Sequence, residues 1–145
     1  MRAAVWYGKE DVRVEDVPEP TPTEGEVILQ IERTGICGTD LHEYLAGPLV
    51  ASPGTIMGHE FSGTVVETGP GVTGFRPGQR VAGIGVTGDG TCWYCRHGLP
   101  GLCENPTFIG LRRPGALAPL VSVPASALFE VPDELSLVDA ALVEP

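Results

Sequence analysis

Three cysteines lie close together in the segment "GDGTCWYCRHGLPGLCEN", residues 88–105. Cys92 and Cys95 form a CxxC pair, which places two sulfur atoms on one tight turn, and Cys103 follows eight positions later. Zinc binds thiolates in tetrahedral sets of four, and three cysteines at this spacing are typical of a structural zinc loop. Free thiols and a redox-active CxxC pair are the alternatives. Asp89 precedes Cys92 with the same spacing of two intervening residues, so it is the candidate for the fourth ligand.

Asp89 has two interpretations. Gly-Asp-Gly at 88–90 is an ordinary turn sequence, in which an aspartate bonds its own backbone. A carboxylate oxygen is also an accepted zinc ligand, although it is a harder donor than a thiolate. An aspartate with a pKa of ~3.9 is already ionised at pH 7, whereas a cysteine with a pKa of ~8.5 must first lose a proton. We therefore favour Asp89 as the fourth ligand of the loop.

A second set of metal-binding residue types lies in "GICGTDLHEY" and "GHEF". Cys37, His59 and Glu60 would make an open zinc site, in which three protein ligands leave one position for a substrate or water. Taken singly, Cys37 is equally well a small buried apolar residue, and His42 an exposed helix residue. His97, inside the cysteine loop, is interpreted as a solvated side chain.

The sequence also contains Gly83-x-Gly85-x-x-Gly88, which matches the dinucleotide-binding fingerprint in form. That fingerprint works only when its glycines open a helix whose N-terminus meets the pyrophosphate. Here they continue into "DGTCWYC", which cannot form that helix. We therefore expect no cofactor-binding residues in this chain.

Alternating apolar residues predict the strands that must position these side chains. Val27, Leu29 and Ile31 share one face of a strand, and Phe61, Gly63 and Val65 share a face in "EFSGTVVETG". Further strands are expected around Val12 and Val14, in "RVAGIGV" at 80–86, in "ALAPLVSV" at 116–123 and in "ALFEVP" at 127–132.

Helical signal is sparse. "DLHEYLAG" at 40–47 begins at Asp40, a candidate cap, and Ser136-x-x-Asp139 has the capping-box pattern. The 20 glycines and 14 prolines suit short strands joined by turns. The sequence therefore predicts a mainly β, partly open barrel with short helices and a zinc-binding lobe at about 87–107.

The bulk composition limits the partners. A chain of 145 residues is long enough for one domain with a core, and its formal charge of −10 argues against nucleic acid and anionic membranes. The first residues lack the apolar run of a signal peptide, and no stretch approaches the ~20 apolar residues of a membrane span. We expect a soluble cytoplasmic protein, in which CxxC spacing favours metal over disulfide.

Four stretches in this order identify a resemblance: "ICGTDLHEY", "GHEFSGTVVETGPGVTGFRPGQRV", "CWYCRHGLPGLCEN" and "ALFEVPDELSLVDAALVEP". Together they closely resemble the N-terminal, GroES-like catalytic domain of zinc-dependent medium-chain alcohol dehydrogenases. Within that family the chain looks most like the butanediol, sorbitol and threonine dehydrogenase branch. The resemblance implies one GroES-like catalytic domain over 1–145, without the nucleotide-binding domain that completes these enzymes.

The resemblance also implies roles for individual residues. Cys37 and His59 match the catalytic zinc ligands, Glu60 matches the carboxylate beside the zinc, and Glu144 matches the remaining acidic position, which binds directly or through water. Thr39 matches the hydroxyl that bonds the substrate oxygen, and His42 the histidine that passes the proton to solvent in many relatives. Asp40 would orient a ligand from behind, and Asp89, Cys92, Cys95 and Cys103 would hold the structural zinc.

The implied reaction is the oxidation of a small alcohol or polyol. Zinc lowers the pKa of the alcohol and steadies the alkoxide, Thr39 and His42 remove the proton, and the hydride leaves for NAD or NADP. That cofactor needs the missing domain, so we expect the isolated chain to bind zinc without turning over alcohol. Assembly into a homo-oligomer is a further expectation from the relatives.

A zinc-stabilised GroES-like binding or scaffold module without catalysis is the alternative function. It predicts zinc in the cysteine loop and none at Cys37 and His59. A thiol-redox protein built on Cys92 and Cys95 would instead form a reversible disulfide. The chain departs from the family at Asp89, at the missing domain, and at Pro119-Leu120, where relatives often carry Glu-Tyr.

Overall fold

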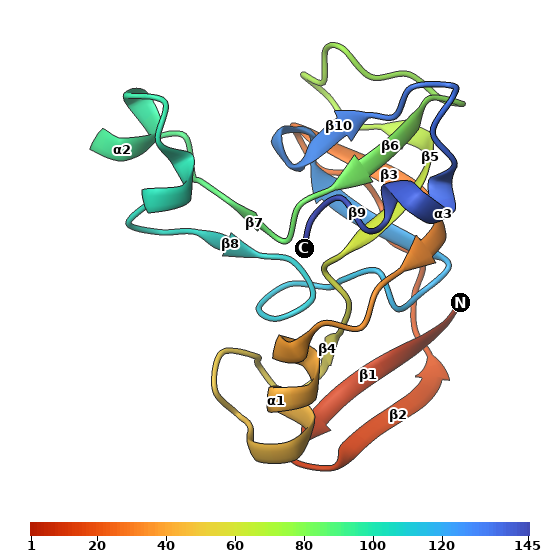
Figure 1. Cartoon of the computed structure of the whole chain (residues 1–145), viewed down its shortest axis with the longest axis vertical. Helices are drawn as coiled ribbons and strands as arrows, with labels where there is room; N and C mark the ends of the chain where they lie inside the picture. The colour runs from red at the N-terminus through yellow and green to blue at the C-terminus, as the bar shows by residue number, and fades with distance from the viewer.

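The larger part of the fold is a five-stranded antiparallel sheet with the order β10-β6-β5-β3-β9. A computed structural model describes all 145 residues. The sheet curls around a core of eleven buried apolar residues, which includes Leu29, Phe61 and Val65 (Figure 1). Its strands are β3 (Glu26–Thr34), β5 (Phe61–Thr68), β6 (Arg80–Gly83), β9 (Leu120–Pro124) and β10 (Leu128–Glu130).

A second, three-stranded sheet has the order β2-β1-β4 and lies beside helix α1 (Figure 1). Trp6 of β1 is completely buried in its own apolar cluster with Met57 and Leu111. The two sheets do not close into one barrel, which confirms the prediction of a mainly β, partly open barrel. The elements are β1 (Arg2–Gly8), β2 (Asp11–Asp16), β4 (Thr55–Ile56) and α1 (Gly38–Ala46).

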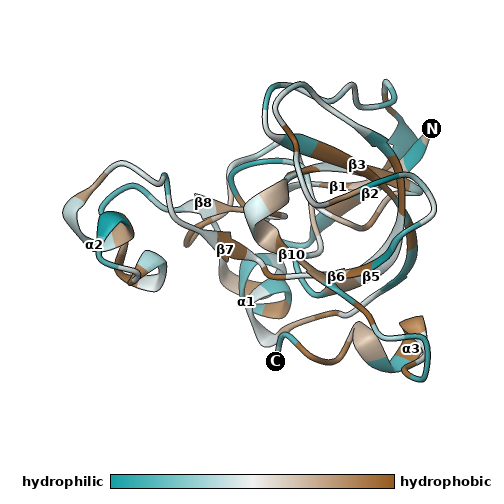
Figure 2. Ribbon diagram, turned by 90° about the horizontal axis from the view of Figure 1, so that it is seen from above, coloured by the Kyte–Doolittle hydropathy of each residue, from teal (hydrophilic) through white to brown (hydrophobic).

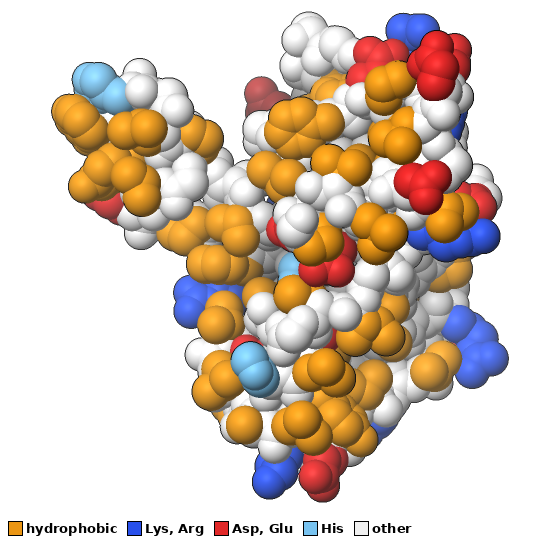
Figure 3. All heavy atoms as spheres, viewed as in Figure 1, with side chains coloured by type: hydrophobic (Ala, Val, Ile, Leu, Met, Phe, Trp, Pro, Cys, Tyr) orange, Lys and Arg blue, Asp and Glu red, His pale blue; other side chains and the backbone are white.

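The cysteine loop forms a lobe that projects from the barrel on a two-stranded arm (Figures 1 and 2). The arm pairs β7 (Val86–Thr87) with β8 (Thr107–Phe108) in antiparallel register. Beyond it lie helix α2 (Trp93–Arg96) and the 3-10 turn η1 (Pro100–Leu102), neither of which has a buried residue. Apolar side chains are instead exposed on the lobe surface (Figure 3), among them Trp93, Leu99 and Leu102.

The predicted strands are present, but some of their bounds differ from the prediction. The stretch 80–86 is not one strand, because β6 ends at Gly83 and the chain turns toward the lobe before β7 begins. Val12 and Val14 lie on a strand as predicted, but both are exposed, because β2 is the edge of the smaller sheet. The strand predicted at 116–123 begins only at Leu120, in β9, and the strand predicted at 127–132 is reduced to β10; the 3-10 turn η2 (Ala125–Ala127) lies between them.

The prediction that Asp40 caps the first helix is wrong in detail. Helix α1 begins one residue after Cys37, which is its N-cap, and Asp40 is the third helical residue. The Asp40 carboxylate accepts a hydrogen bond from the Cys37 backbone N–H at 2.9 Å, as the carboxylate of a capping box does. Ser136 caps α3 (Leu137–Ala140) as predicted, but this helix is a single turn. No helix has the combination of length and apolar character needed to cross a membrane.

A half-buried ion pair joins the start of β3 to the segment before β9. The Arg113 guanidinium lies 2.5 Å from Glu26, and Ser122 donates a hydrogen bond to the same carboxylate at 2.8 Å. Burial alone would raise the pKa of Glu26, but the hydrogen bonds from Arg113, Ser122 and Thr23 lower it from 4.5 to about 2. This carboxylate is therefore ionised in the folded chain under acidic conditions that protonate it in the unfolded chain.

Acid should accordingly destabilise the fold through Glu26. Because the pKa is depressed in the folded state, the stabilisation is complete above the unfolded pKa of ~4.5 and is lost as the pH falls toward 2, by about 3 kcal/mol in all. Denaturant unfolding at several pH values, with wild type and Glu26→Gln side by side, measures this. The difference between the two free energies of unfolding should shrink across this window, and a constant difference would contradict the assignment.

Candidate metal centres

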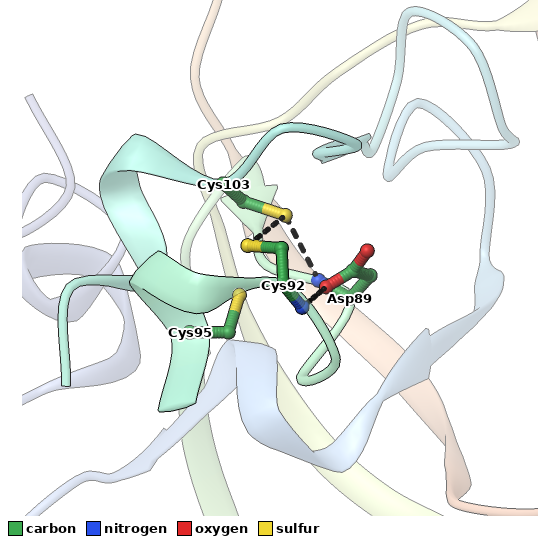
Figure 4. Close-up of side chains that lie close together, drawn as sticks. All are labelled: Asp89, Cys92, Cys95 and Cys103. Atoms are coloured by element: carbon green, nitrogen blue, oxygen red, sulfur yellow. Dashed lines mark hydrogen bonds between the residues drawn. The ribbon is translucent and has the colours of Figure 1, made fainter. Parts of the chain in front are cut away.

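Four candidate ligands converge in the lobe. Donor atoms of Asp89, Cys92, Cys95 and Cys103 all lie within 4.8 Å of one another (Figure 4). The sulfur atoms of Cys92 and Cys103 are 3.8 Å apart, far beyond the ~2.05 Å of a disulfide, and all the cysteines are free. Three thiols and one carboxylate in this space form a donor set that fits zinc.

Backbone amides surround the sulfur atoms. Cys103 Sγ accepts hydrogen bonds from the N–H groups of Asp89 and Asn105, each at 3.3 Å. The amides of Cys95 and Glu104 lower the pKa of Cys92, whereas desolvation and the neighbouring thiols and carboxylate raise the pKa of Cys95 to about 12. Without a cation, the clustered thiols cannot all ionise beside one another and beside the Asp89 carboxylate, because their negative charges would repel. A divalent cation would neutralise this repulsion, which supports the metal interpretation.

Asp89 is placed for both of the roles considered for it. Its Oδ1 accepts a hydrogen bond from the Thr91 N–H at 2.8 Å and another from the Cys92 N–H at 3.2 Å, so it forms the turn. The bond from Cys92 is drawn in Figure 4. Those amides also lower its pKa below the ordinary range. A carboxylate oxygen of Asp89 remains within 4.8 Å of the three sulfur atoms, so the turn does not remove it from the donor set.

The second candidate centre joins two distant segments. Cys37, His59 and Glu60 have donor atoms within 4.8 Å of one another. Cys37 comes from the N-cap of α1, while His59 and Glu60 immediately precede β5. The Gly35 N–H donates to the Glu60 carbonyl at 2.7 Å, which holds the two segments together.

Next to this centre, one atom of His59 and one atom of Asp40 are buried without a hydrogen-bond partner. His59 Nδ1 and Asp40 Oδ1 lie 3.6 Å apart, are both buried, and have no hydrogen-bond partner. Burial raises the pKa of Asp40, and the Cys37 amide opposes this. A histidine that binds a metal through Nε2 keeps its proton on Nδ1 and directs it at a carboxylate. The pair therefore fits a zinc ligand with Asp40 behind it.

A pocket of about 380 Å³ opens onto this centre. Thr39 lines it and lies 3.7 Å from the Cys37 sulfur atom, measured to Oγ1. His42, in contrast, is exposed on α1 outside the pocket. The lining residues are Cys37, Thr39, Val50, His59, Gly85, Val86, Phe108, Leu111 and Glu144. A larger hollow of about 440 Å³ beside β1 and β2 contains no cysteine or histidine.

The chain end returns to the same pocket. Glu144 is half-buried, and its Oε1 accepts a hydrogen bond from the Gly85 N–H at 3.3 Å. Helix α3, which precedes it, is fastened to β5 because Ser62 donates to the Leu137 carbonyl at 2.5 Å. Glu144 thus lines the pocket without belonging to the tight group of Cys37, His59 and Glu60.

Sequence reasoning missed two residues around this site. Glu43 is completely buried, and no pattern in the sequence singled it out. Gly85 touches the centre through its backbone, and the rejected glycine pattern was the only signal for it. Glu43 binds main-chain N–H groups of another segment, and Gly85 binds Glu144 through its own main chain; a residue pattern displays neither contact.

The similarity to known proteins covers nearly all of the chain. A family model described as the alcohol dehydrogenase GroES-like domain matches residues 23–133. L-threonine 3-dehydrogenase of Xanthomonas campestris pv. campestris (strain B100) is 44% identical over 135 residues, which are 91% of this chain and 40% of that protein. The chain therefore spans about two fifths of the length of such relatives.

Solved structures agree with the sequence comparison. (2R,3R)-Butanediol dehydrogenase from Bacillus subtilis has a TM-score of 0.88 and 38% identity, over 99% of this chain and 44% of that one. Galactitol-1-phosphate dehydrogenase from Escherichia coli has a TM-score of 0.92 and 33% identity, over 100% of this chain and 42% of that one. The predicted family and branch are confirmed: the chain belongs to the alcohol dehydrogenase GroES-like domain family, among the medium-chain dehydrogenases.

Proposed function

We propose that this chain is the zinc-binding catalytic part of an NAD- or NADP-dependent dehydrogenase for small alcohols or polyols. The observation that carries the proposal is that Cys37, His59 and Glu60 bring their donor atoms together, and that Cys37 and His59 line a pocket with Thr39 and Glu144. A scaffold module would have no need for buried ligands of this kind beside an open pocket. The threonine and butanediol dehydrogenases among its relatives support a hydroxyl-bearing substrate.

The residues of the pocket have separate tasks in this proposal. Cys37, His59 and Glu60 hold zinc, which as a Lewis acid lowers the pKa of an alcohol. Thr39, which lines the pocket, hydrogen-bonds the substrate hydroxyl and accepts its proton while it passes its own hydroxyl proton on toward solvent. Glu144 supplies a carboxylate to the pocket wall, either as a further ligand or through water.

His42 has a place at the outer end of this path. It follows Thr39 by three residues on α1, so the two side chains lie on the same side of the helix, and it is exposed to solvent. Histidine is a common proton shuttle in proteins. We assign it the release of the substrate proton to solvent.

A nucleotide-binding domain elsewhere in the longer protein would supply NAD or NADP and the other wall of the cleft. The relatives are more than twice as long as this chain, since its 135 aligned residues make up 40% of the threonine dehydrogenase. The 145 residues alone should therefore bind zinc but neither bind NADH tightly nor oxidise alcohol. Homo-oligomerisation is part of the same proposal.

Native mass spectrometry tests the proposal by counting zinc in the purified chain. The wild type should carry two zinc ions, and His59→Ala and Cys37→Ser should each carry one. Cysteine alkylation followed by peptide mapping identifies the remaining site, which should be the lobe. A wild-type chain that holds one lobe zinc, unchanged in His59→Ala, would overturn the catalytic assignment in favour of a scaffold. Micromolar binding of NADH to the chain in calorimetry would overturn the need for a second domain.

A further inference from the structure

The segment Gly83-x-Gly85-x-x-Gly88 connects the two candidate metal centres. Gly83 ends β6, Gly85 precedes β7 and Gly88 follows it, so the segment runs from the barrel past the pocket into the lobe. A Cβ atom at each glycine would meet a different neighbour. The three positions therefore have three separate reasons to lack a side chain.

Gly83 belongs to the core. A Cβ atom there would lie within van der Waals overlap of the Phe61 ring, and Phe61 is completely buried among the strands of the large sheet. A side chain at this position would displace a core ring, so its effect is on the stability of the barrel.

Gly85 belongs to the pocket. A Cβ atom there would lie 2.9 Å from His59 Cβ, 3.3 Å from His59 Cδ2 and 3.4 Å from Glu144 Oε1. Because His59 Cβ is attached directly to the backbone, the histidine cannot rotate out of this contact. The Gly85 N–H also donates to Glu144 at 3.3 Å, so the same backbone unit touches both sides of the pocket.

Gly88 belongs to the lobe. A Cβ atom there would lie 2.5 Å from the Cys95 sulfur atom and 3.1 Å from Pro100 Cβ. Cys95 could avoid the added atom only by rotating its sulfur away from Asp89, Cys92 and Cys103. Neither Gly85 nor Gly88 adopts a left-handed backbone conformation, so the space beside them, not backbone strain, is what a side chain would disturb.

We propose that Gly85 and Gly88 are positioning residues for two different zinc sites. Gly85 lets the chain lie against His59 and holds Glu144, and Gly88 lets it lie against Cys95. Two added methyl groups, three residues apart, should therefore each weaken a different site. The Gly85 half rests on the proposed function, because it takes Cys37, His59 and Glu60 as a zinc site, whereas the Gly88 half depends only on the lobe.

The experiment compares Gly85→Ala and Gly88→Ala with an alanine in open space. Gly101→Ala is the matched control, because Gly101 has no atom within 4 Å of an added Cβ and no left-handed conformation. Zinc per chain is counted by native mass spectrometry, and zinc affinity is measured by competition with a chelator. Alkylation rates at Cys37 and at the lobe cysteines report which site is open.

Gly85→Ala should bind zinc about tenfold or more weakly at the pocket and retain the lobe zinc. Gly88→Ala should show the reverse, and Gly101→Ala should match the wild type. His59→Ala is the reference for Gly85→Ala, and Cys95→Ala is the reference for Gly88→Ala. The thermal midpoint of each glycine variant should lie within a few degrees of that of its reference.

Equal occupancy of both sites in all three alanine variants would overturn the proposal. So would a Gly85→Ala chain that unfolds under conditions in which His59→Ala is folded, because Gly85 would then be a core position like Gly83. Failure of the proposed function looks different: the wild type itself would lack pocket zinc, while Gly88→Ala would still lose the lobe zinc.

Discussion

Replacing Glu43 by glutamine is expected to lower the free energy of unfolding by about 3 kcal/mol, or roughly 10 °C in the thermal midpoint of a chain of this size. Glu43 is completely buried and accepts hydrogen bonds from three consecutive backbone N–H groups. Leu49 donates to one oxygen at 2.9 Å, while Val50 and Ala51 donate to the other, at 2.5 and 3.0 Å. Although burial alone would raise the pKa of Glu43, these amides lower it.

A glutamine in this position has only one acceptor oxygen. Its NH₂ group would face one or more of the three amide donors, so at least one buried N–H would lose its partner. The segment held by Glu43 includes Val50, which lines the pocket, and the helix that carries Glu43 begins beside Cys37. The same substitution should therefore weaken zinc binding at the pocket.

Thermal unfolding followed by circular dichroism measures the effect. Glu32→Gln is the matched control, because Glu32 is an exposed carboxylate whose ion pair with Arg33 has both side chains 53% exposed. That control should change the free energy of unfolding by no more than about 0.5 kcal/mol. Equal stability of the two variants would contradict a structural role for Glu43.

The sequence was sufficient to predict the barrel strands and the two ligand clusters because these depend on local periodicity and on residue type. Val27, Leu29, Phe61 and Val65 are all fully buried, as their alternation predicted. Alternation did not indicate that Ser62, on the opposite face of β5, is also buried, because α3 covers it from a distant part of the chain. A period of two identifies a face but not what covers the other face.

Glu43 and the glycines of the segment after β6 show the limit more clearly. A glutamate on a short polar helix is normally solvated, and only the path of the following loop turns three amides toward it. Gly85 and Gly88 match a cofactor-binding pattern in type and spacing, yet their neighbours are His59, Glu144 and Cys95. Such contacts arise when separate segments meet, so they depend on the tertiary fold.

Removing the lobe metal should disorder the lobe while the barrel stays folded. No residue from 88 to 105 is buried, and none belongs to an apolar cluster of the molecule. The arm that carries the lobe is itself short, with two residue pairs between β7 and β8. Because the lobe has no core, metal coordination must supply the free energy that orders it, about 10 kcal/mol in small zinc-dependent folds.

The two tryptophans allow the lobe and the barrel to be followed separately. Trp93 stacks on His97 in the lobe with ring centroids 4.1 Å apart, while Trp6 is completely buried in the barrel. A chelator should separate Trp93 from His97, seen as a change in Trp93 fluorescence, and raise amide exchange in residues 92–103 by about a hundredfold or more. Amides of β3 and β5 should keep their protection, and Trp93→Phe should abolish the fluorescence change.

Variants at the lobe ligands separate metal loss from other effects of the chelator. Cys92→Ser should resemble the chelated wild type before any chelator is added, whereas Cys37→Ser should keep an ordered lobe until chelation. Asp89→Asn retains an oxygen that can accept the turn hydrogen bonds but lacks the carboxylate charge, so it should lose lobe zinc at lower chelator concentrations than the wild type if Asp89 is a ligand. If Asp89→Asn keeps its lobe zinc as well as the wild type does against the chelator, while Asp89→Ala loses it more easily, then Asp89 stabilises the turn and is not a zinc ligand. If the lobe amides of Cys92→Ser remain protected from exchange, the lobe is ordered without metal. That result would contradict the prediction, which rests on the absence of buried residues in the lobe.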